Sequence, residues 1–299
     1  MALGGNPIFN GKNFRGATQA PPVPQAPYGA PYSQAPYGQQ PYGQAPYGQQ
    51  GWGTPPQAMT DEQLRQMYNQ PSAGPADTGR MTFDDVIMKT AACLGAVLVG
   101  AAITLTVGLP LASLLMIVGA LGGFVLALVN TFKKQPSPAL ILAYAALEGL
   151  FLGGLTRILD IRYEGVGLQA VVGTLSVFAV TLLLFKSGKV RATPKAMRFF
   201  MIALGGYAVF SIVNLVMMLT GVTQEPFGLR SGMLGVVIGL LAIGLAAFSL
   251  VMDFTSIEEG VRNGAPQRFS WTAAFGLTVT LVWLYVEIIR LLAILRGDD

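Results

Sequence analysis

The feature that most constrains this chain is a series of seven apolar stretches, each about 20 residues long, which begins near Met81. An α-helix needs about 20 apolar residues to cross the hydrocarbon core of a bilayer, and in a helix every backbone hydrogen bond is satisfied within the segment. The sequence therefore predicts an all-α, polytopic membrane protein with seven transmembrane helices. The predicted spans are approximately 85–107, 111–132, 138–159, 166–185, 196–219, 232–257 and 271–294.

The composition of the chain supports a membrane location. Hydrophobic residues make up 52% of the chain and charged residues only 11%, whereas soluble domains carry about 25% charge. Downstream of Met81 most charges fall in the gaps between the apolar stretches. Residues 81–296 are therefore predicted to form the membrane domain.

The residues before this domain have a different composition. Residues 1–58 repeat the motif APYG, for example from Ala26, Ala35 and Ala45, with glutamine between the repeats. Proline and glycine oppose regular structure and few aliphatic side chains are available for burial, so we predict a disordered cytoplasmic tail. The tail is either a solvated spacer or an arm that binds a partner. Residues 59–80 are predicted to be a linker, in which Thr60 can cap a short helix.

Two counts restrict the chemistry. The chain has no histidine, which excludes Ser-His-Asp triads and HExxH zinc sites. Its one cysteine, Cys93, cannot form an intramolecular disulfide or a thiolate metal site by itself and is expected to pack. We therefore expect a protein that is not an enzyme, with no catalytic residues, no cofactor and no metal site. The net charge of +4 comes largely from lysine and arginine in the loops, where the orientation of the chain in the membrane explains it, so we also expect no affinity for nucleic acid.

The distribution of lysine and arginine predicts the orientation of the chain in the membrane. Cytoplasmic loops carry the excess of basic residues. The gaps after the second, fourth and sixth spans are basic, whereas the alternate gaps are neutral or balanced. The N-terminus is therefore predicted to be cytoplasmic and the C-terminus external. The basic residues are Lys133, Lys134, Lys186, Lys189, Arg191, Lys195, Arg262 and Arg268.

Three acidic residues lie inside apolar stretches: Glu148 in the third, Asp253 in the sixth and Glu287 in the seventh. A carboxylate at the centre of a membrane helix costs about 2.5–3.5 kcal/mol on insertion scales, so such residues are rare and often functional. Arg290 is three residues beyond Glu287, so the two can form either a structural ion pair or part of a functional site.

Asp253 has no opposite charge within one turn of its own predicted helix. Desolvation disfavours the charged form of such an acid, so Asp253 is the expected titrating group. The alternative is that Asp253 caps, or lies at the interface beside, a short segment that contains Glu258 and Glu259. Neutral polar residues that can complete an ion pathway are Tyr144, Asn214, Thr278 and Thr280.

Small residues recur four apart within three spans, at Gly119 and Gly123, Gly149 and Gly153, and Gly235 and Gly239. This spacing lets two membrane helices approach closely. The pairs predict internal packing and carry little information about function.

Three strings resemble the Bax inhibitor-1 family, and its bacterial YccA-like branch in particular: YAALEGLFLGG, LVMDFTSIEEGVRNGAP and AAFGLTVTLVWLYVEIIRLLAIL. The resemblance covers about residues 81–296. It implies a seven-helix protein of the bacterial inner membrane, in which a carboxylate pair on the last two helices is a pH-sensitive latch. Asp253 matches the first member of that pair, within the D-x-x-x-I pattern that ends at Ile257. The position of the second aspartate is Thr280 here, so a latch of two carboxylates would use Asp253 with Glu287 or Glu148.

The resemblance implies two classes of function. The first is a pH-sensitive cation leak channel that passes calcium, with Asp253, Glu287, Glu148, Arg290 and Thr280 as the pH-sensing and ion-pathway residues. The alternative is a regulator that binds and modulates a membrane-bound quality-control protease or a stress response, with the tail as its contact surface.

The basic loops generate a prediction about topology. Single cysteines placed at Glu164 or Asp299 should react with a membrane-impermeant thiol reagent added to intact cells, and a cysteine at Lys189 should not. The measurement is the fraction of each variant that is labelled before and after the cells are opened. Labelling of the Lys189 variant in intact cells would overturn the predicted orientation.

Overall fold

The computed structural model describes residues 79–190, 192–225 and 227–297. The predicted disordered tail over 1–58 and the short helix capped by Thr60 lie outside these residues. Within them, seven α-helices are long and apolar enough to cross a membrane, which confirms the predicted number of spans. They are α3 (Phe83–Thr106), α4 (Leu109–Phe132), α5 (Pro138–Arg162), α6 (Val166–Lys186), α7 (Pro194–Leu219), α8 (Gly232–Arg262) and α9 (Ser270–Gly297), with short 3₁₀ turns η1 (Gly228–Arg230) and η2 (Gln267–Phe269).

Local sequence signals explain where the helices start. Thr82 caps α3 by accepting a hydrogen bond from the Asp85 amide at 3.1 Å, and Thr193 caps α7 in the same way. Proline occupies the first turn of α4, α5 and α7, where its missing amide hydrogen removes no helical bond. The gap between α3 and α4 is only Val107 and Gly108, so a tight turn joins these two helices.

The end of α8 differs from the prediction. The helix continues to Arg262, beyond the predicted end at residue 257, and stops before Gly264, whose φ of 65° ends the helical conformation. Glutamate is a good helix former, so the polar residues Glu258 and Glu259 extend the helix instead of ending it. Asp253 is therefore an interior residue of α8, and the alternative that it caps a separate segment is wrong.

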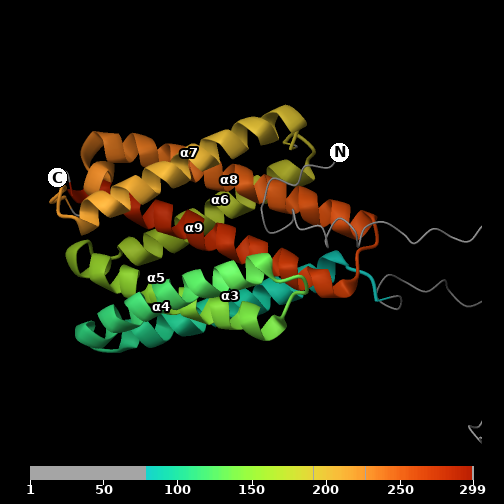
Figure 1. The fold of residues 1–299 in the computed structure, drawn as a ribbon, viewed down its shortest axis with the longest axis horizontal. Helices are drawn as coiled ribbons and strands as arrows, with labels where there is room; N and C mark the ends of the chain where they lie inside the picture. The colour runs from blue at the N-terminus through green and yellow to red at the C-terminus, as the bar shows by residue number, and fades with distance from the viewer. Residues whose placement is uncertain (1–78, 191, 226, 298–299) are drawn as a thin grey trace, which may run out of the picture. The chain divides into compact units, whose positions relative to one another are not determined.

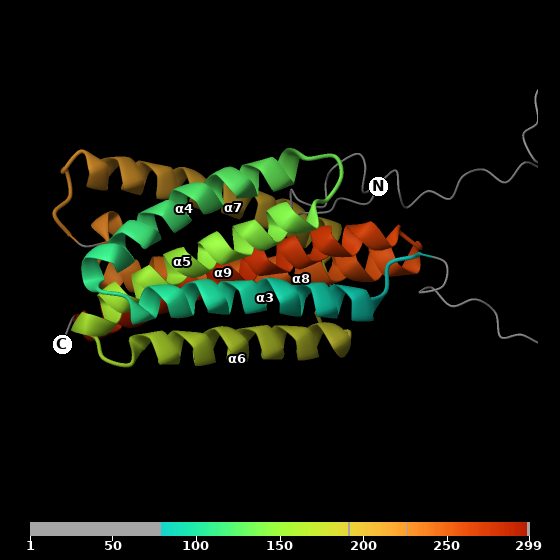
Figure 2. The same cartoon turned by 90° about the horizontal axis from the view of Figure 1, so that it is seen from below.

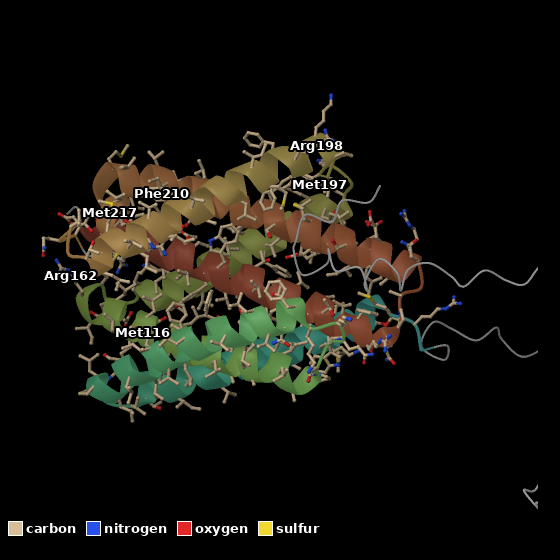
Figure 3. All side chains as sticks on the ribbon, in the orientation of Figure 1. Met116, Arg162, Met197, Arg198, Phe210 and Met217 are labelled. Carbon is tan, nitrogen blue, oxygen red and sulfur yellow. The ribbon has the colours of Figure 1, made fainter. Side chains whose placement is uncertain are left out.

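Successive helices run in alternating directions, so their connections gather at two ends (Figure 1). The connections after α4, α6 and α8 lie at one end, which we call the basic-loop end. Those after α3, α5 and α7 lie at the opposite end, together with the end of α9. In Figure 3, Arg198 at the start of α7 and Arg162 at the end of α5 mark these two ends.

Helix α9 lies in the middle of the bundle, with α8 and α6 on one side and α3 and α5 on the other (Figures 1 and 2). Its most apolar window is 67% buried, compared with 6% for α7. The main hydrophobic cluster accordingly contains residues of α9 together with α8 and α6. Most polar groups on α9 therefore need hydrogen-bond partners inside the protein.

Glycine allows α5 to pack very closely against α3 and α4. A Cβ atom at Gly149 would lie 2.9 Å from the carbonyl carbon of Val97 and 3.0 Å from the Cα of Gly100. A Cβ at Gly119 would meet the Phe151 amide nitrogen of α5 at 2.6 Å. The predicted packing role of these glycines is confirmed, because the helix backbones touch where a side chain would stand.

The segment that leads into α3 is tied to the connection between α8 and α9. The Met81 amide donates to the Ala265 carbonyl at 2.7 Å, and the Gln267 amide donates to the Gly79 carbonyl at 2.9 Å. Arg80 and Pro266 form an antiparallel bridge between these bonds, and the Met81 side chain is fully buried. The start of the first described helix is thereby fixed to the last helical hairpin.

The close packing of α5 predicts that Gly149→Ala destabilises the protein. The new methyl group would force α3 and α5 apart, at a cost of about 1–3 kcal/mol for overpacking. The measurement is the midpoint of thermal unfolding in detergent. The matched control is Gly244→Ala in α8, where a Cβ meets nothing within 4 Å. This control should keep or raise the midpoint, and an equal loss in both variants would contradict the packing argument.

Candidate functional site

Asp253 and Thr280 meet at the contact between α8 and α9. The Thr280 hydroxyl donates to the Asp253 carboxylate, with 2.7 Å between Oγ1 and Oδ2. Asp253 is 0% exposed and Thr280 is 3% exposed. Leu250, Phe254 and Leu277 belong to the surrounding apolar cluster, so the carboxylate lies in a hydrophobic environment. The structure thus brings together Asp253 and the position at which the resemblance places its partner.

This pair can exist in two protonation states without breaking its contact. An ionised carboxylate only accepts hydrogen bonds, whereas a protonated one can also donate. A hydroxyl both donates and accepts, so Thr280 can donate to ionised Asp253 or accept from the protonated form. What changes on titration is the charge between the two helices. In an apolar environment, that charge is far more costly than in water.

Glu287 lies at a second polar site on α9, seven residues beyond Thr280 and therefore about 10 Å further along the helix axis. Its carboxylate is bonded from three directions. Arg290 Nη1 donates at 2.8 Å, Trp283 Nε1 donates at 3.2 Å, and the Tyr207 hydroxyl of α7 donates to the same oxygen as Trp283. The predicted pairing of Glu287 with Arg290 is present, within a larger network.

Arg230 of η1, in the connection between α7 and α8, completes this network. Its Nη1 atom is 3.7 Å from Glu287 Oε1 and donates to the Tyr207 hydroxyl at 2.9 Å, while Nη2 donates to the Ser211 hydroxyl. Arg230 is 6% exposed, and burial, followed by the charge of Arg290, lowers its pKa below the usual arginine value. The network joins α7 and η1 to α9.

Asn214, which the sequence suggested as a pathway residue, holds η1 in place. Its side-chain oxygen accepts from the Leu229 amide at 2.7 Å, and its nitrogen donates to the Phe227 carbonyl at 3.2 Å. These bonds satisfy backbone groups that the short turn leaves unpaired. Asn214 therefore fixes the position from which Arg230 reaches the network.

Glu148 lies in a third place, where α5 packs against α4. A Cβ atom at Gly123 of α4 would lie 2.9 Å from Glu148 Oε1. One turn before Glu148, the ring of Tyr144 packs edge-on against Phe275 of α9, with centroids 5.0 Å apart. The five predicted residues thus divide into Asp253 with Thr280, Glu287 with Arg290, and Glu148.

Sequence reasoning missed Tyr207, Ser211 and Arg230. Arg230 stands in a short connection with one acidic residue, so its charge looks balanced and solvent-exposed. Tyr207 and Ser211 are four residues apart and share one face of α7, which was the available signal. Without the fold, however, nothing in their spacing points to Glu287.

These features define a multi-pass α-helical membrane protein with acidic side chains buried between its helices. The chain also matches the model of the family described as Bax inhibitor 1 like, over residues 6–297. The match covers most of the chain, and the protein therefore belongs to this family. The matched range starts at residue 6, well before residue 81, where the resemblance noted in the sequence begins. No curated protein matches the chain.

The contact between Asp253 and Thr280 generates a stability prediction. Thr280→Val removes the hydroxyl at nearly constant shape and leaves a buried acceptor without that donor, which should cost about 1–3 kcal/mol. Thermal unfolding in detergent measures the loss. The matched control is Thr278→Val on the same helix, because Thr278 is also fully buried but donates to the Ala274 carbonyl of its own helix at 2.7 Å. Equal losses in the two variants would show that the bond to Asp253 contributes nothing special.

Proposed function

We propose that this protein is a cation leak channel of the membrane, permeable to calcium and sensitive to pH, in which Asp253 is the titrating group. The observation that carries the proposal is a carboxylate with 0% exposure, bonded at 2.7 Å across the contact between α8 and α9. Membrane-embedded acids of this kind mark ion and proton pathways in membrane proteins. The family to which the chain belongs supports a membrane role of this type.

The proposed gating follows from the cost of a charge in hydrocarbon. When Asp253 is protonated, the packed arrangement of α8 and α9 is favoured, because the buried carboxyl group is then neutral. When Asp253 is ionised, an arrangement that admits water or a cation to the carboxylate gains free energy relative to the packed one. Flux should therefore rise as the pH rises. The hydroxyl of Thr280 accommodates both states of the acid.

The other acids have distinct proposed roles. Glu287 shares its network with Arg290 and Arg230, so we assign it to holding α7 and η1 against α9 during gating. Glu148 is half-buried at about mid-depth of α5, and we propose it as a supporting acid of the pathway. In this scheme no residue is catalytic, and the protein is not an enzyme.

The alternative function is a regulator that binds a membrane-bound protease or acts in a stress response. This role requires a contact surface instead of a conducting path. It needs no change of charge at Asp253. A substitution that removes the charge of Asp253 should therefore change the pH dependence of a channel but leave the binding of a regulator to its partner intact.

The proposal is tested by calcium flux into proteoliposomes of the full chain between about pH 6 and pH 8. Asp253→Asn keeps the volume and the acceptor for Thr280 but removes the titration, so flux should become largely independent of pH. Wild-type flux should rise several-fold over the same range. Glu259→Gln, six residues further along α8, is the matched control and should retain the wild-type response.

Two results contradict the proposal in different ways. A full pH response in the Asp253→Asn protein places the sensor elsewhere. No flux from the folded wild-type protein at any pH rejects the channel, and capture of a membrane protease by the same protein would then favour the regulator.

A further inference from the structure

A cavity of about 530 Å³ lies between α5, α7, η1 and α9. Its volume is within the range of about 300–1,000 Å³ typical of small-molecule sites. Most of its wall is apolar, with Phe151 and Leu155 of α5, Leu215 and Met218 of α7, and Val286 of α9. The polar network around Glu287 forms the remaining wall. The cavity thus combines an apolar surface with a charged one.

The charges that line this cavity do not balance. Arg230 and Arg290 carry two positive charges and Glu287 carries one negative charge, and the remaining lining residues are neutral. The site therefore has a formal charge of about +1 in a largely desolvated position. Such an excess is costly unless an anion offsets it. Burial is the main cause of the lowered pKa of Arg230, and the charge of Arg290 lowers this pKa further.

The guanidinium groups also have unused hydrogen-bonding capacity. Arg230 Nε is buried and has no hydrogen-bond partner among the described residues. Among the residues that the structure describes, Arg290 donates one hydrogen bond, to Glu287, and its side chain is 19% exposed. A guanidinium has five donors, so the pair can still bind an oxyanion with charge-assisted bonds.

The depth of these groups fits the headgroup of a lipid. Arg290 precedes the end of α9 by seven residues, or about 10 Å of helix. The 28 residues of α9 span about 42 Å, whereas the hydrocarbon core is about 30 Å thick. If the excess is shared between the two ends, Arg290 lies only about 5 Å inside the apolar boundary. Trp283 lies seven residues before Arg290 on α9 and lines the deeper part of the cavity, about 10 Å from Arg290 along the helix axis.

We propose that this cavity binds an anionic phospholipid, with its phosphate between Arg230 and Arg290 and the start of one acyl chain beside Trp283. Phosphatidylglycerol, with one net negative charge, balances the site. The proposal does not depend on ion conduction or on Asp253, which lies on another part of α9.

Trp283 lines the cavity and reports on its occupant. The test uses the full chain with Trp52→Phe and Trp271→Phe, which leaves Trp283 as the single tryptophan. The protein is reconstituted into symmetric phosphatidylcholine vesicles, to which phospholipids with brominated acyl chains are added. Brominated phosphatidylglycerol should half-quench Trp283 at about one tenth of the mole fraction that brominated phosphatidylcholine needs, as expected for one added charge-assisted interaction.

Charge variants separate the proposed site from general attraction to the membrane surface. Arg230→Gln and Arg290→Gln should each reduce the tenfold preference to about twofold or less. Glu287→Gln adds to the positive excess and should keep or increase the preference. Arg296→Gln is the matched control, because Arg296 lies on the same helix and at the same end but is bonded to the Glu164 carbonyl at 2.7 Å outside the cavity. It should behave as the parent protein.

Each opposite result overturns the proposal. Equal quenching by the two lipids in the parent protein shows that the headgroup is not recognised. A loss of preference in Arg296→Gln as large as in Arg230→Gln shows that the attraction is not specific to the cavity. A loss in Glu287→Gln shows that the network acts through structure alone. Displacement of the brominated lipid by millimolar glycerol phosphate shows that the site takes a free phosphate instead of a lipid.

Discussion

A charge inside a membrane protein must be stabilised by neighbours that replace water, and this constraint shapes the centre of the bundle. Helix α9 is the most buried of the seven spans, so its polar side chains bond within α9 or to neighbouring elements. Thr280 and Glu287 each draw a different element towards α9. The first contacts α8 through Asp253, and the second contacts α7 and η1 through Tyr207 and Arg230. The polar contacts therefore connect α8, α7 and η1 to α9, while the close glycine packing joins α3, α4 and α5.

The two polar sites differ in how their charge is compensated. Glu287 has two arginines within 4 Å, so its negative charge is more than balanced. The Asp253 carboxylate receives a bond from a neutral hydroxyl within an apolar cluster. An over-compensated acid is suited to holding helices together, since protonation would leave two positive charges beside each other. The Thr280 hydroxyl can donate to ionised Asp253 or accept from the protonated form, so this contact allows a change of state, which is why the proposed sensor is Asp253.

The number of helices and most of their boundaries followed from the sequence, because the length of an apolar stretch directly reflects the thickness of a bilayer. The end of α8 did not, because Glu258 and Glu259 mark the end of the apolar stretch but not the end of the helix. The pairing of Glu287 with Arg290 was visible, since it is local to one helix. The partnership of Asp253 with Thr280 was accessible only as a resemblance, and the contributions of Tyr207 and Arg230 were not accessible at all. These contacts join residues 23 to 80 positions apart, and only the packing of the helices determines them.

The bridge between residues 79–81 and 265–267 gives the bundle a mechanical property. Two backbone hydrogen bonds and the buried Met81 side chain connect the beginning of α3 to the turn between α8 and α9. A pulling force parallel to the two paired segments loads both hydrogen bonds at once, whereas a force that peels the segments apart breaks the bonds one after the other. A force applied to the chain just before Gly79 is therefore divided between α3 and the hairpin that holds Asp253 and Thr280. Tension on residues 79–81 is transmitted to α8 and α9 directly, without passing through α4, α5, α6 and α7.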